Sequence, residues 1–417
     1  MQKNTKIPLR IAVIGAGVRG TSLTRKLASS EFPTRIVAVA EPVHERRTAF
    51  AQQYDLPKDA QFPSWQVFVD SPVVCDAVIV ATMDDQHTNP VVACLRRGCH
   101  ILVEKPLADT FVGCQSIVSA QRKAGLVVSV CHTLRFMEAF RRIKQIVDDG
   151  VLGKLIHIEH MEAIGHYRFT HNYVRGRWSR EENNAFLLLH KCCHDLDFLA
   201  WLIGSQCSHV SSFGSLTYFS PANAPAGSGE RCLQDCQIVE SCPYSALRVY
   251  VDADLSDRLS DLGKIETRRD RLDAVRYGPF GICVWQAGNN VVDHQVVSME
   301  FTNGTTANCT LSGYAAHHGR RTTVQGTRAE LIFSEADHSI AINHFFESES
   351  DHIDLPRINT YHPEDQEIVD NWLSKIFGQH NERMNVDANE AMRNLAIVFA
   401  AERSRKTGRI VEMEEYY

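Results

Sequence analysis

Short apolar runs alternate with amphipathic stretches over the first third of the chain. The runs are RIAVI, RIVAVA, CDAVIVAT, CHILVEKP and LVVSV, and the stretches between them include NPVVACLRRG and FVGCQSIVSAQRKAG. Brief apolar runs bounded by turn residues are typical of buried strands, whereas the longer stretches repeat their apolar positions with a helical period. Alternating β and α units of this length predict a doubly wound parallel sheet that binds its ligand at the carboxyl ends of the strands.

The pattern changes in the second half of the chain. The segment VVDHQVVSMEFTNGTTANCTLSGY alternates apolar and polar residues, which predicts two strands joined by a type I′ turn at Asn303-Gly304. The tail around NEAMRNLAIVFAAERSRKTG predicts a helix that stops at Gly408. We predict two domains, 1–133 and 134–417, with a cysteine-rich insert at about 220–285 that begins with the Pro- and Gly-rich SPANAPAGSGE.

Three glycines follow the first apolar run in the pattern Gly15-x-Gly17-x-x-Gly20. The first permits a tight turn, the second lets a pyrophosphate approach the main chain, and the third lets the next helix pack on the strand. The amino end of that helix, which holds Val18 and Arg19, offers unpaired N–H groups to phosphates. The loop predicts a dinucleotide site. The alternative is a glycine-rich turn that binds nothing.

Glu41 follows the second apolar run, about 20 residues after the last glycine. A carboxylate there accepts hydrogen bonds from the ribose hydroxyls and repels a 2′-phosphate. We therefore favour NAD over NADP as the cofactor. Arg46 and Arg47 lie close by and leave contact with a phosphate open.

Polar residues also follow the next two strands, where they are expected to face the cofactor crevice. Thr82 and His87 follow the strand CDAVIVAT, and Glu104-Lys105-Pro106 follows CHILV. A lysine ammonium beside a nicotinamide can orient a substrate oxygen and relay its proton. We expect Lys105 to take this role, with Glu104 holding the lysine.

In combination, these motifs resemble the glucose–fructose oxidoreductase / inositol dehydrogenase / rhizopine-catabolism (Gfo/Idh/MocA) family. The matching segments are VIGAGVRG, AVIVATMDDQH, HILVEKPLA, GKLIHIEH, LLHKCCHDLDFLAWLIG, GTTANCTLSGY and GTRAELIF. The resemblance implies an α/β protein with an N-terminal Rossmann domain and a C-terminal α/β domain built on a large open, mostly antiparallel sheet, which often makes subunit contacts. It also implies NAD(P)-dependent chemistry on a sugar or polyol. By the same resemblance, Lys105 and His194 are catalytic.

The segment HKCCHDLD, at 190–197, is predicted to be helical. His190 and His194 would share one helix face, with Lys191 three residues before His194. A histidine can accept the alcohol proton because its pKa lies near neutrality. The family pattern usually has aspartate where this chain has His190, so His190 or Lys191 is left to orient His194. A His-x-x-x-His metal site is the alternative, and the lack of a neighbouring glutamate disfavours it.

Further substrate contacts are expected at the entry to the second domain. Arg135 follows the last strand of the first domain, and the loop GHYRFTHNYVRGRW contains His166, His171, Arg175 and Trp178. Aromatic faces and planar guanidinium groups suit sugar rings and acidic substituents, so the arginines indicate an anionic substrate such as a uronic acid. The alternative is a basic loop exposed to solvent.

The insert contains RCLQDCQIVESCPYSA, which places Cys232, Cys236 and Cys242 within eleven residues, and Cys283 follows later. Thiolates at this density suit a structural Zn²⁺ site, which we favour over an iron–sulfur cluster. The spacing differs from the usual C-x2-C. A disulfide or free thiols therefore remain alternatives.

Composition narrows the classes of function. The 417 residues are 44% hydrophobic and carry a net charge of −6, which disfavours nucleic-acid binding. No apolar run is long enough for a membrane span, and the polar start MQKNTKIPLR is unlike a signal peptide, so we expect a cytoplasmic protein. A small-molecule substrate and a homodimer or homotetramer are the expected partners.

Three functions are weighed. The first is an NAD-dependent oxidoreductase that acts on a sugar or polyol hydroxyl. The second is a redox-neutral glycoside hydrolase that oxidises its sugar transiently, eliminates the aglycone, adds water and reduces the sugar again. The third, a non-catalytic sugar sensor, is disfavoured because proton-transfer residues such as Lys105 and His194 have no task in a sensor.

Overall fold

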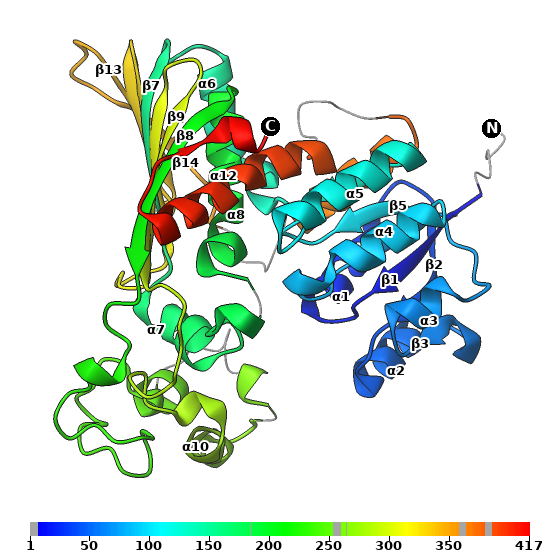
Figure 1. Ribbon diagram of the computed structural model, residues 1–417, viewed down its shortest axis with the longest axis horizontal. Helices are drawn as coiled ribbons and strands as arrows, with labels where there is room; N and C mark the ends of the chain where they lie inside the picture. The colour runs from blue at the N-terminus through cyan, green and yellow to red at the C-terminus, as the bar shows by residue number, and fades with distance from the viewer. Residues whose placement is uncertain (1–6, 184, 253–259, 264, 358–363, 380–385) are drawn as a thin grey trace.

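The computed structural model contains two sheets joined by helices (Figure 1). It describes residues 7–183, 185–252, 260–263, 265–357, 364–379 and 386–417. A six-stranded sheet lies within residues 9–130 and a nine-stranded sheet within residues 155–412, and we call these two parts the first and second halves of the molecule.

The first sheet is parallel throughout and has the strand order β3-β2-β1-β4-β5-β6. Its strands are β1 (Leu9–Ile14), β2 (Thr34–Ala40), β3 (Gln61–Phe62), β4 (Ala77–Val80), β5 (His100–Val103) and β6 (Val128–Val130). The helices of this half are α1 (Val18–Lys26), α2 (His44–Gln53), α3 (Trp65–Val69), α4 (Thr88–Arg96) and α5 (Phe111–Ala124). This arrangement confirms the predicted doubly wound sheet. The strand order reverses between β1 and β4, which is where such sheets bind ligands.

The second sheet has the order β14-β13-β12-β11-β7-β10-β9-β8-β15, and all its neighbours are antiparallel except β7 and β10. Its strands are β7 (Leu155–Ala163), β8 (Cys207–Ser215), β9 (His294–Phe301), β10 (Thr306–Ser312), β11 (Gly319–Gly326), β12 (Ala329–Ser334), β13 (Ser339–His344), β14 (Asp351–Asp354) and β15 (Val411–Glu412). The predicted mostly antiparallel sheet is confirmed.

The turn predicted between β9 and β10 differs in type. Gly304 has φ +83°, but Asn303 has no positive φ, whereas a type I′ turn needs positive φ at both positions. The Asn303 side chain instead accepts a hydrogen bond from the Thr305 N–H at 3.0 Å. The type I′ prediction is therefore wrong. The hairpin that it was meant to close is present.

The remaining helices are α6 (Glu138–Asp148), α7 (His166–Phe169), α8 (Leu187–Ile203), α10 (Arg268–Tyr277), α11 (Asp365–Ile376) and α12 (Ala388–Thr407). The long α12 contacts α5 on one side and α8 and β8 on the other, and it crosses from the first half to the second sheet in Figure 1. As predicted, it ends at Gly408, which has φ +67°. One continuous apolar core runs through both halves, so the strand ends of the first sheet are fixed relative to α8.

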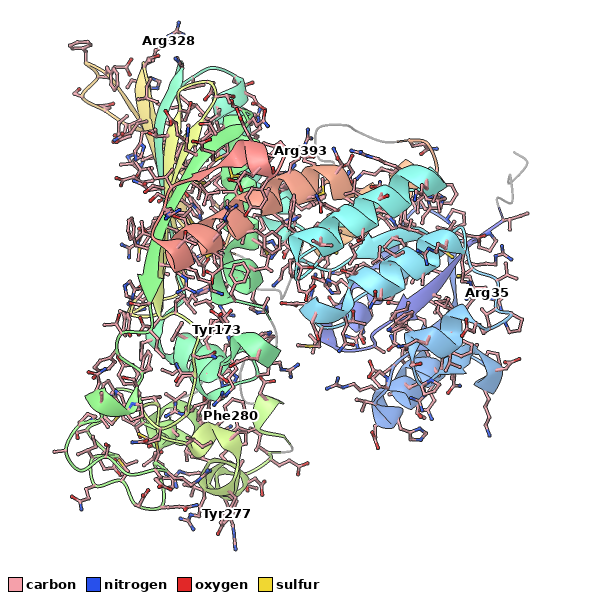
Figure 2. All side chains as sticks on the ribbon, in the orientation of Figure 1. Arg35, Tyr173, Tyr277, Phe280, Arg328 and Arg393 are labelled. Carbon is pink, nitrogen blue, oxygen red and sulfur yellow. The ribbon has the colours of Figure 1, made fainter. Side chains whose placement is uncertain are left out.

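The segment between β8 and β9 forms a separate lobe around α10, beyond the end of the second sheet (Figure 1). Phe280 and Tyr277 lie in this lobe, and Tyr173 lies between it and the sheet (Figure 2). The lobe has a small core of its own, made by Cys232, Ala246, Val249, Tyr250, Val251 and Val275.

Candidate active site

The glycine loop has the shape that a dinucleotide requires. Gly15 has φ +91°, and a Cβ there would lie 2.5 Å from the Ala81 carbonyl oxygen. A Cβ on Gly20 would collide with the carbonyl of Gly15, so both positions exclude side chains. A Cβ on Gly17, the N-cap of α1, would meet nothing within 4 Å. Open space in front of a helix amino end is what a pyrophosphate needs, and Val18 is exposed at the same end.

Glu41 is buried against the glycine loop. Its carboxylate accepts a hydrogen bond from the Ala16 N–H at 2.8 Å and another from the Val43 N–H at 2.9 Å. These bonds fix the carboxylate beside the loop and leave lone pairs for ribose hydroxyls. The Arg47 guanidinium is occupied by the carbonyl oxygens of Glu41 and Pro42.

Arg19 does not point at the predicted phosphate site. Its guanidinium pairs with Glu104 at 2.7 Å and with the buried Asp365 of α11 at 2.8 Å. Glu104 therefore holds Arg19 and not the Lys105 ammonium. From Lys105, only the backbone N–H reaches the Glu104 carboxylate, at 3.2 Å. The pair locks α1 and α11 to the end of β5.

His87 contacts the backbone of two neighbouring loops. Its buried ring lies between two carbonyl oxygens, with Nδ1 2.7 Å from Pro106 O and Nε2 3.3 Å from Thr82 O. The Thr82 hydroxyl donates to the carbonyl of Gln86 at 3.0 Å. The loops after β4 and β5 are thus held together, and both ring nitrogens of His87 face carbonyl oxygens of the protein.

Lys105 bridges the two halves of the molecule. It follows β5, and its ammonium donates a hydrogen bond to the carbonyl oxygen of His190, on the first turn of α8, at 2.8 Å. The positive charge lowers the pKa of His190 and His194, after the larger effect of burial. Lys105 and the histidines of HKCCHDLD are therefore neighbours.

His190 forms a carboxylate–imidazole pair with Asp84, which follows β4. Nδ1 of His190 lies 2.7 Å from Asp84 Oδ2. Burial alone would raise the pKa of Asp84, but the nearby His190 and Lys105 hold it well below its usual range. Burial followed by Lys105 lowers the pKa of His190, so the ring is neutral and donates Nδ1–H to an ionised carboxylate. Trp178 stacks on the ring at 4.6 Å between centroids.

His194 lies one turn further along α8. Its Nδ1 is buried without a hydrogen-bond partner among the described residues. The fully buried ring of His132 stands at 88° to it, with the centroids 5.7 Å apart. Burial, then Lys105 and His132, lower the pKa of His194 well below its usual value. A neutral imidazole here can accept a proton.

Lys191 faces a buried charge network on the second sheet. Its ammonium lies 2.9 Å from Glu162 of β7, and Arg320 of β11 lies 2.9 Å from the same carboxylate. Arg320 also pairs with Asp195 at 2.6 Å. Burial opposes ionisation of Glu162, but Arg320 and Lys191 keep its pKa below the usual value. The network fixes α8 against the sheet.

Three residues expected to contact substrate are occupied elsewhere. Arg135 is buried and pairs with Asp197 at 2.8 Å and with Glu390 at 2.7 Å. His171 lies 2.9 Å from both the Tyr250 hydroxyl and the Asp261 carboxylate. Arg175 donates to the carbonyl oxygens of Ile282 and Tyr244, at 2.7 and 2.8 Å. The structure places these three in the frame around the site. His166 is half-buried near Tyr244, and Trp178 reaches the site through its stacking on His190.

The predicted zinc site finds no support. The described residues include Cys232, Cys236, Cys242 and Cys283, yet they contain no group of three or more His, Cys, Asp or Glu side chains that could hold a metal ion. All four cysteines are free thiols. The same holds for HKCCHDLD, whose histidines take separate roles.

Three site residues were not predicted from the sequence. Asp84 stands in a loop after a buried strand, and its position was the signal that could have identified it. His132 follows β6 in the same manner. Glu162 carries no such signal, because only the folded sheet brings it to Lys191.

The helices of the described residues do not include one that is long and apolar enough to cross a membrane.

Comparison with known proteins gives matches over most of the chain. It is 27% identical to 2,7-anhydro-N-acetylneuraminate hydratase of Mediterraneibacter gnavus over 203 residues. These residues make up 49% of this chain and 51% of that protein. It is 28% identical over 201 residues to inositol 2-dehydrogenase 2 of Saccharopolyspora erythraea, which is 48% of this chain and 55% of that protein. The chain thus spans about half the length of these curated relatives.

A solved oxidoreductase from Agrobacterium radiobacter, in complex with NAD+, L-tartaric acid and magnesium, shares the fold with a TM-score of 0.69 and 13% identity, covering 98% of this chain and 99% of that one. The family profile described as "Oxidoreductase family, NAD-binding Rossmann fold" matches residues 9–132. The profile of the C-terminal alpha/beta domain matches 144–413. The chain therefore belongs to the Gfo/Idh/MocA oxidoreductase family.

Proposed function

We propose that this protein is an NAD-dependent oxidoreductase that oxidises a hydroxyl group of a sugar or polyol. One observation carries the proposal. Lys105, which follows β5 of the parallel sheet, lies close to His190 and His194: its ammonium donates to the His190 carbonyl oxygen, and its charge lowers the pKa of both histidines. An ammonium with two neutral imidazoles in its neighbourhood suits the removal of a hydroxyl proton.

The residues around the glycine loop fit NAD. Gly15, Gly17 and Gly20 would hold the pyrophosphate at the amino end of α1, and the fixed Glu41 carboxylate would accept the ribose hydroxyls. A 2′-phosphate would meet that carboxylate, which supports NAD over NADP. When bound, NAD supplies the acceptor for the hydride.

The side chains of this chain supply the proton chemistry. Lys105 orients the substrate oxygen with its ammonium, which is already directed into the site by the His190 carbonyl. His194, neutral because of its burial, accepts the hydroxyl proton as the carbonyl forms. The Asp84 carboxylate fixes the His190 tautomer, so that Nε2 is the acceptor nitrogen. Arg135 and Arg175 are tied to protein oxygens, and support for an anionic substrate is correspondingly weaker.

One observation favours a second candidate, the redox-neutral glycoside hydrolase. Two imidazoles, each with its own environment, lie near Lys105, and a single oxidation needs only one base. The extra group could remove the acidified C–H proton or protonate the departing aglycone.

The face of the second sheet opposite α8 supports the expected homo-oligomer. Phe213, Val296 and Ile332 are exposed on it, with 70%, 37% and 41% of their surface accessible. Pairing two copies through this face would bury them.

To test the proposal, the purified protein is incubated with NAD and a panel of neutral and anionic sugars, polyols and glycosides. Nicotinamide reduction and sugar release are recorded together. Net NADH without bond cleavage is expected. Sugar release without net NADH would instead establish the hydrolase. Lys105→Met should lower the turnover on the active substrate about 100-fold or more, while Lys123→Met, on the exposed face of α5, should leave it unchanged. Tight NAD binding with neither signal would overturn both candidates for that panel.

A further inference from the structure

Two cysteines of the first domain are in contact at the amino ends of neighbouring strands. Cys75 precedes β4 and Cys99 precedes β5, and these strands are parallel neighbours in the first sheet. The two sulfur atoms are 3.3 Å apart, although the residues are 24 positions apart in sequence. The Cys99 Sγ also lies 3.5 Å from the Cys75 carbonyl oxygen. The folded sheet therefore brings together two thiols that come from separate segments.

Backbone hydrogen bonds hold both cysteines in this position. The Asp76 N–H donates to the Arg10 carbonyl oxygen at 2.8 Å, and the His100 N–H donates to the Asp76 carbonyl oxygen at 2.9 Å. The register of β4 and β5 sets Cys75 and Cys99 one position apart along the strands. Strands about 4.8 Å apart with a stagger of about 3.3 Å put the two Cα atoms roughly 6 Å apart, within the range of about 4.4–6.8 Å that a disulfide requires. The pair can therefore be joined without a movement of the backbone.

A fixed positive charge acts on the pair. The Arg97 guanidinium donates to the carbonyl oxygens of Phe68 and Val73, each at 2.7 Å. The hydrogen bond from Cys75 is the largest influence on Cys99 and lowers the pKa of its thiol, and the Arg97 charge acts in the same direction, while burial opposes both. The same bond between the sulfurs raises the pKa of Cys75, because the two thiols then share one proton. Such a setting favours a thiolate, the reactive form of cysteine.

Cys75 is one of the few thiols that solvent can reach. Of the thirteen cysteines in the chain, Cys75 and Cys236 are partly exposed and the other eleven are buried. Oxidation of a thiol by a small molecule requires access to the sulfur, and a neighbouring second thiol resolves the oxidised form into a disulfide. Cys75 has both the access and, in Cys99, the neighbour.

We propose that Cys75 and Cys99 form a redox-active dithiol that a hydroperoxide oxidises to a disulfide. The Cys75 sulfur attacks one oxygen of the hydroperoxide, so that an S–O bond forms, the O–O bond breaks, and the released alcohol or water takes up the thiol proton. The Cys99 sulfur then attacks the Cys75 sulfur, so that the S–S bond forms, the S–O bond breaks, and water leaves with the second proton. The two sulfurs together lose two electrons, and the hydroperoxide gains them. Two molecules of a small thiol restore the dithiol by exchange and leave as their own disulfide.

The dithiol lies at the opposite edge of the first sheet from the candidate active site. Cys75 and Cys99 are at the amino ends of β4 and β5, whereas Asp84 and Lys105 follow the carboxyl ends of the same strands. A disulfide closes the stretch of chain between the two cysteines into a loop, which stabilises the first domain by restricting its unfolded state. Oxidation should therefore change the stability of the protein and leave the cofactor site unaltered.

The first experiment treats the reduced, folded protein with a small excess of hydrogen peroxide and then alkylates the thiols that remain. Peptide mapping by mass spectrometry, without reduction, should find a bond between Cys75 and Cys99, and dithiothreitol should remove it. Both thiols alkylated as before, Cys75 oxidised further without a bond, or Cys75 joined to the neighbouring Cys94 would each overturn the proposal. The measurement uses the unaltered chain, so a variant that fails to fold cannot obscure the result.

Cysteine variants then test the consequence for stability. Peroxide should raise the thermal midpoint of the unaltered chain by several degrees, and Cys75→Ser and Cys99→Ser should each abolish this shift. Cys236→Ser changes the other partly exposed thiol and should keep the shift. The same shift in all three variants would show that other thiols cause it, and would overturn the proposal. NAD affinity should be equal in the reduced and oxidised protein, so failure of the dithiol is distinguished from failure of the proposed dehydrogenase function.

Discussion

Asp84 and His190 are 106 residues apart in sequence, yet their side chains meet at 2.7 Å. The carboxylate comes from the loop after β4 and the imidazole from the first turn of α8, so the bond joins the Rossmann domain to the second half of the chain. The family resemblance led us to expect an aspartate at position 190, where this chain has histidine. Here the acid is supplied from the opposite side of the site and the helix supplies the imidazole.

Asp84→Asn should lower kcat/KM on the order of 100-fold, within the range that general acid–base groups contribute. An amide cannot provide the negative charge that fixes Nδ1–H on His190, and it can donate to the ring and reverse the tautomer. Loss of the carboxylate also removes an influence that raises the pKa of His190, so any acid limb due to His190 should move to lower pH. Rates measured across pH test both effects.

Asp85→Asn is the matched control for this variant, because its side chain is exposed in the same loop. It should leave kcat/KM and its pH dependence unchanged. If Asp84→Asn also behaves in this manner while the protein stays folded, the pair with His190 serves stability alone.

Glu41→Ala should weaken NAD binding and reduce the preference for NAD over NADP. The carboxylate fixes the Ala16 and Val43 N–H groups, and hydrogen bonds to a charged group contribute about 1.5–3 kcal/mol, or roughly 10- to 100-fold in Kd. Titration calorimetry with both nucleotides measures the change. The exposed Glu45→Ala should alter neither affinity. An unchanged ratio of the two affinities in Glu41→Ala would show that the acid only shapes the loop.

Most of the fold was predictable because its signals are local. The buried runs at β1, β4 and β5 are apolar at every central position, and the glycine pattern allows one backbone path. The helix with HKCCHDLD was predictable for the same reason. The type I′ turn failed because Thr305 and the Asn303 side chain form a different loop, a detail that residue preference does not determine.

The candidate site was predictable only in part. Lys105 and His194 follow from motif and strand position, but the directions of long side chains depend on partners distant in sequence. Arg19 turns to Asp365, and Arg135 turns to Asp197 and Glu390, because a buried guanidinium requires carboxylates. The sequence around Arg19 and Arg135 does not indicate that these carboxylates will be their partners.

Glu162→Gln should destabilise the fold by about 3–5 kcal/mol, the usual cost of breaking a buried ion pair on one side. Glutamine keeps the shape but leaves Lys191 and Arg320 without their shared negative charge. Urea unfolding at neutral pH measures the loss. Glu159→Gln changes the same strand at a side chain that is 69% exposed, and should cost less than about 0.5 kcal/mol. Similar values for the two variants would mean that the Glu162 network does not stabilise the fold.

Stability should fall as the pH drops from neutrality to about 5.5, because several histidines are held neutral in the fold. The pKa values of His132, His190, His194 and His318 are all lowered, with burial as the largest cause in each. Below about pH 6.5 the unfolded chain binds a proton at each of these side chains and the folded chain does not, so unfolding becomes easier. Each such histidine costs up to about 1.4 kcal/mol per pH unit.

His318 allows this pH dependence to be measured for one group. Burial, followed by the Lys191 charge, lowers its pKa to about 3, so its contribution should be lost continuously between pH 6.5 and that value. His318→Asn removes the titration and should flatten the fall in unfolding free energy between pH 7 and 5.5, by an amount that approaches about 1.4 kcal/mol per unit at the lower end of that range. His352→Asn, at an exposed position on β14, should keep the slope of the unaltered protein. The same slope in both variants would show that His318 is protonated in the fold at these pH values.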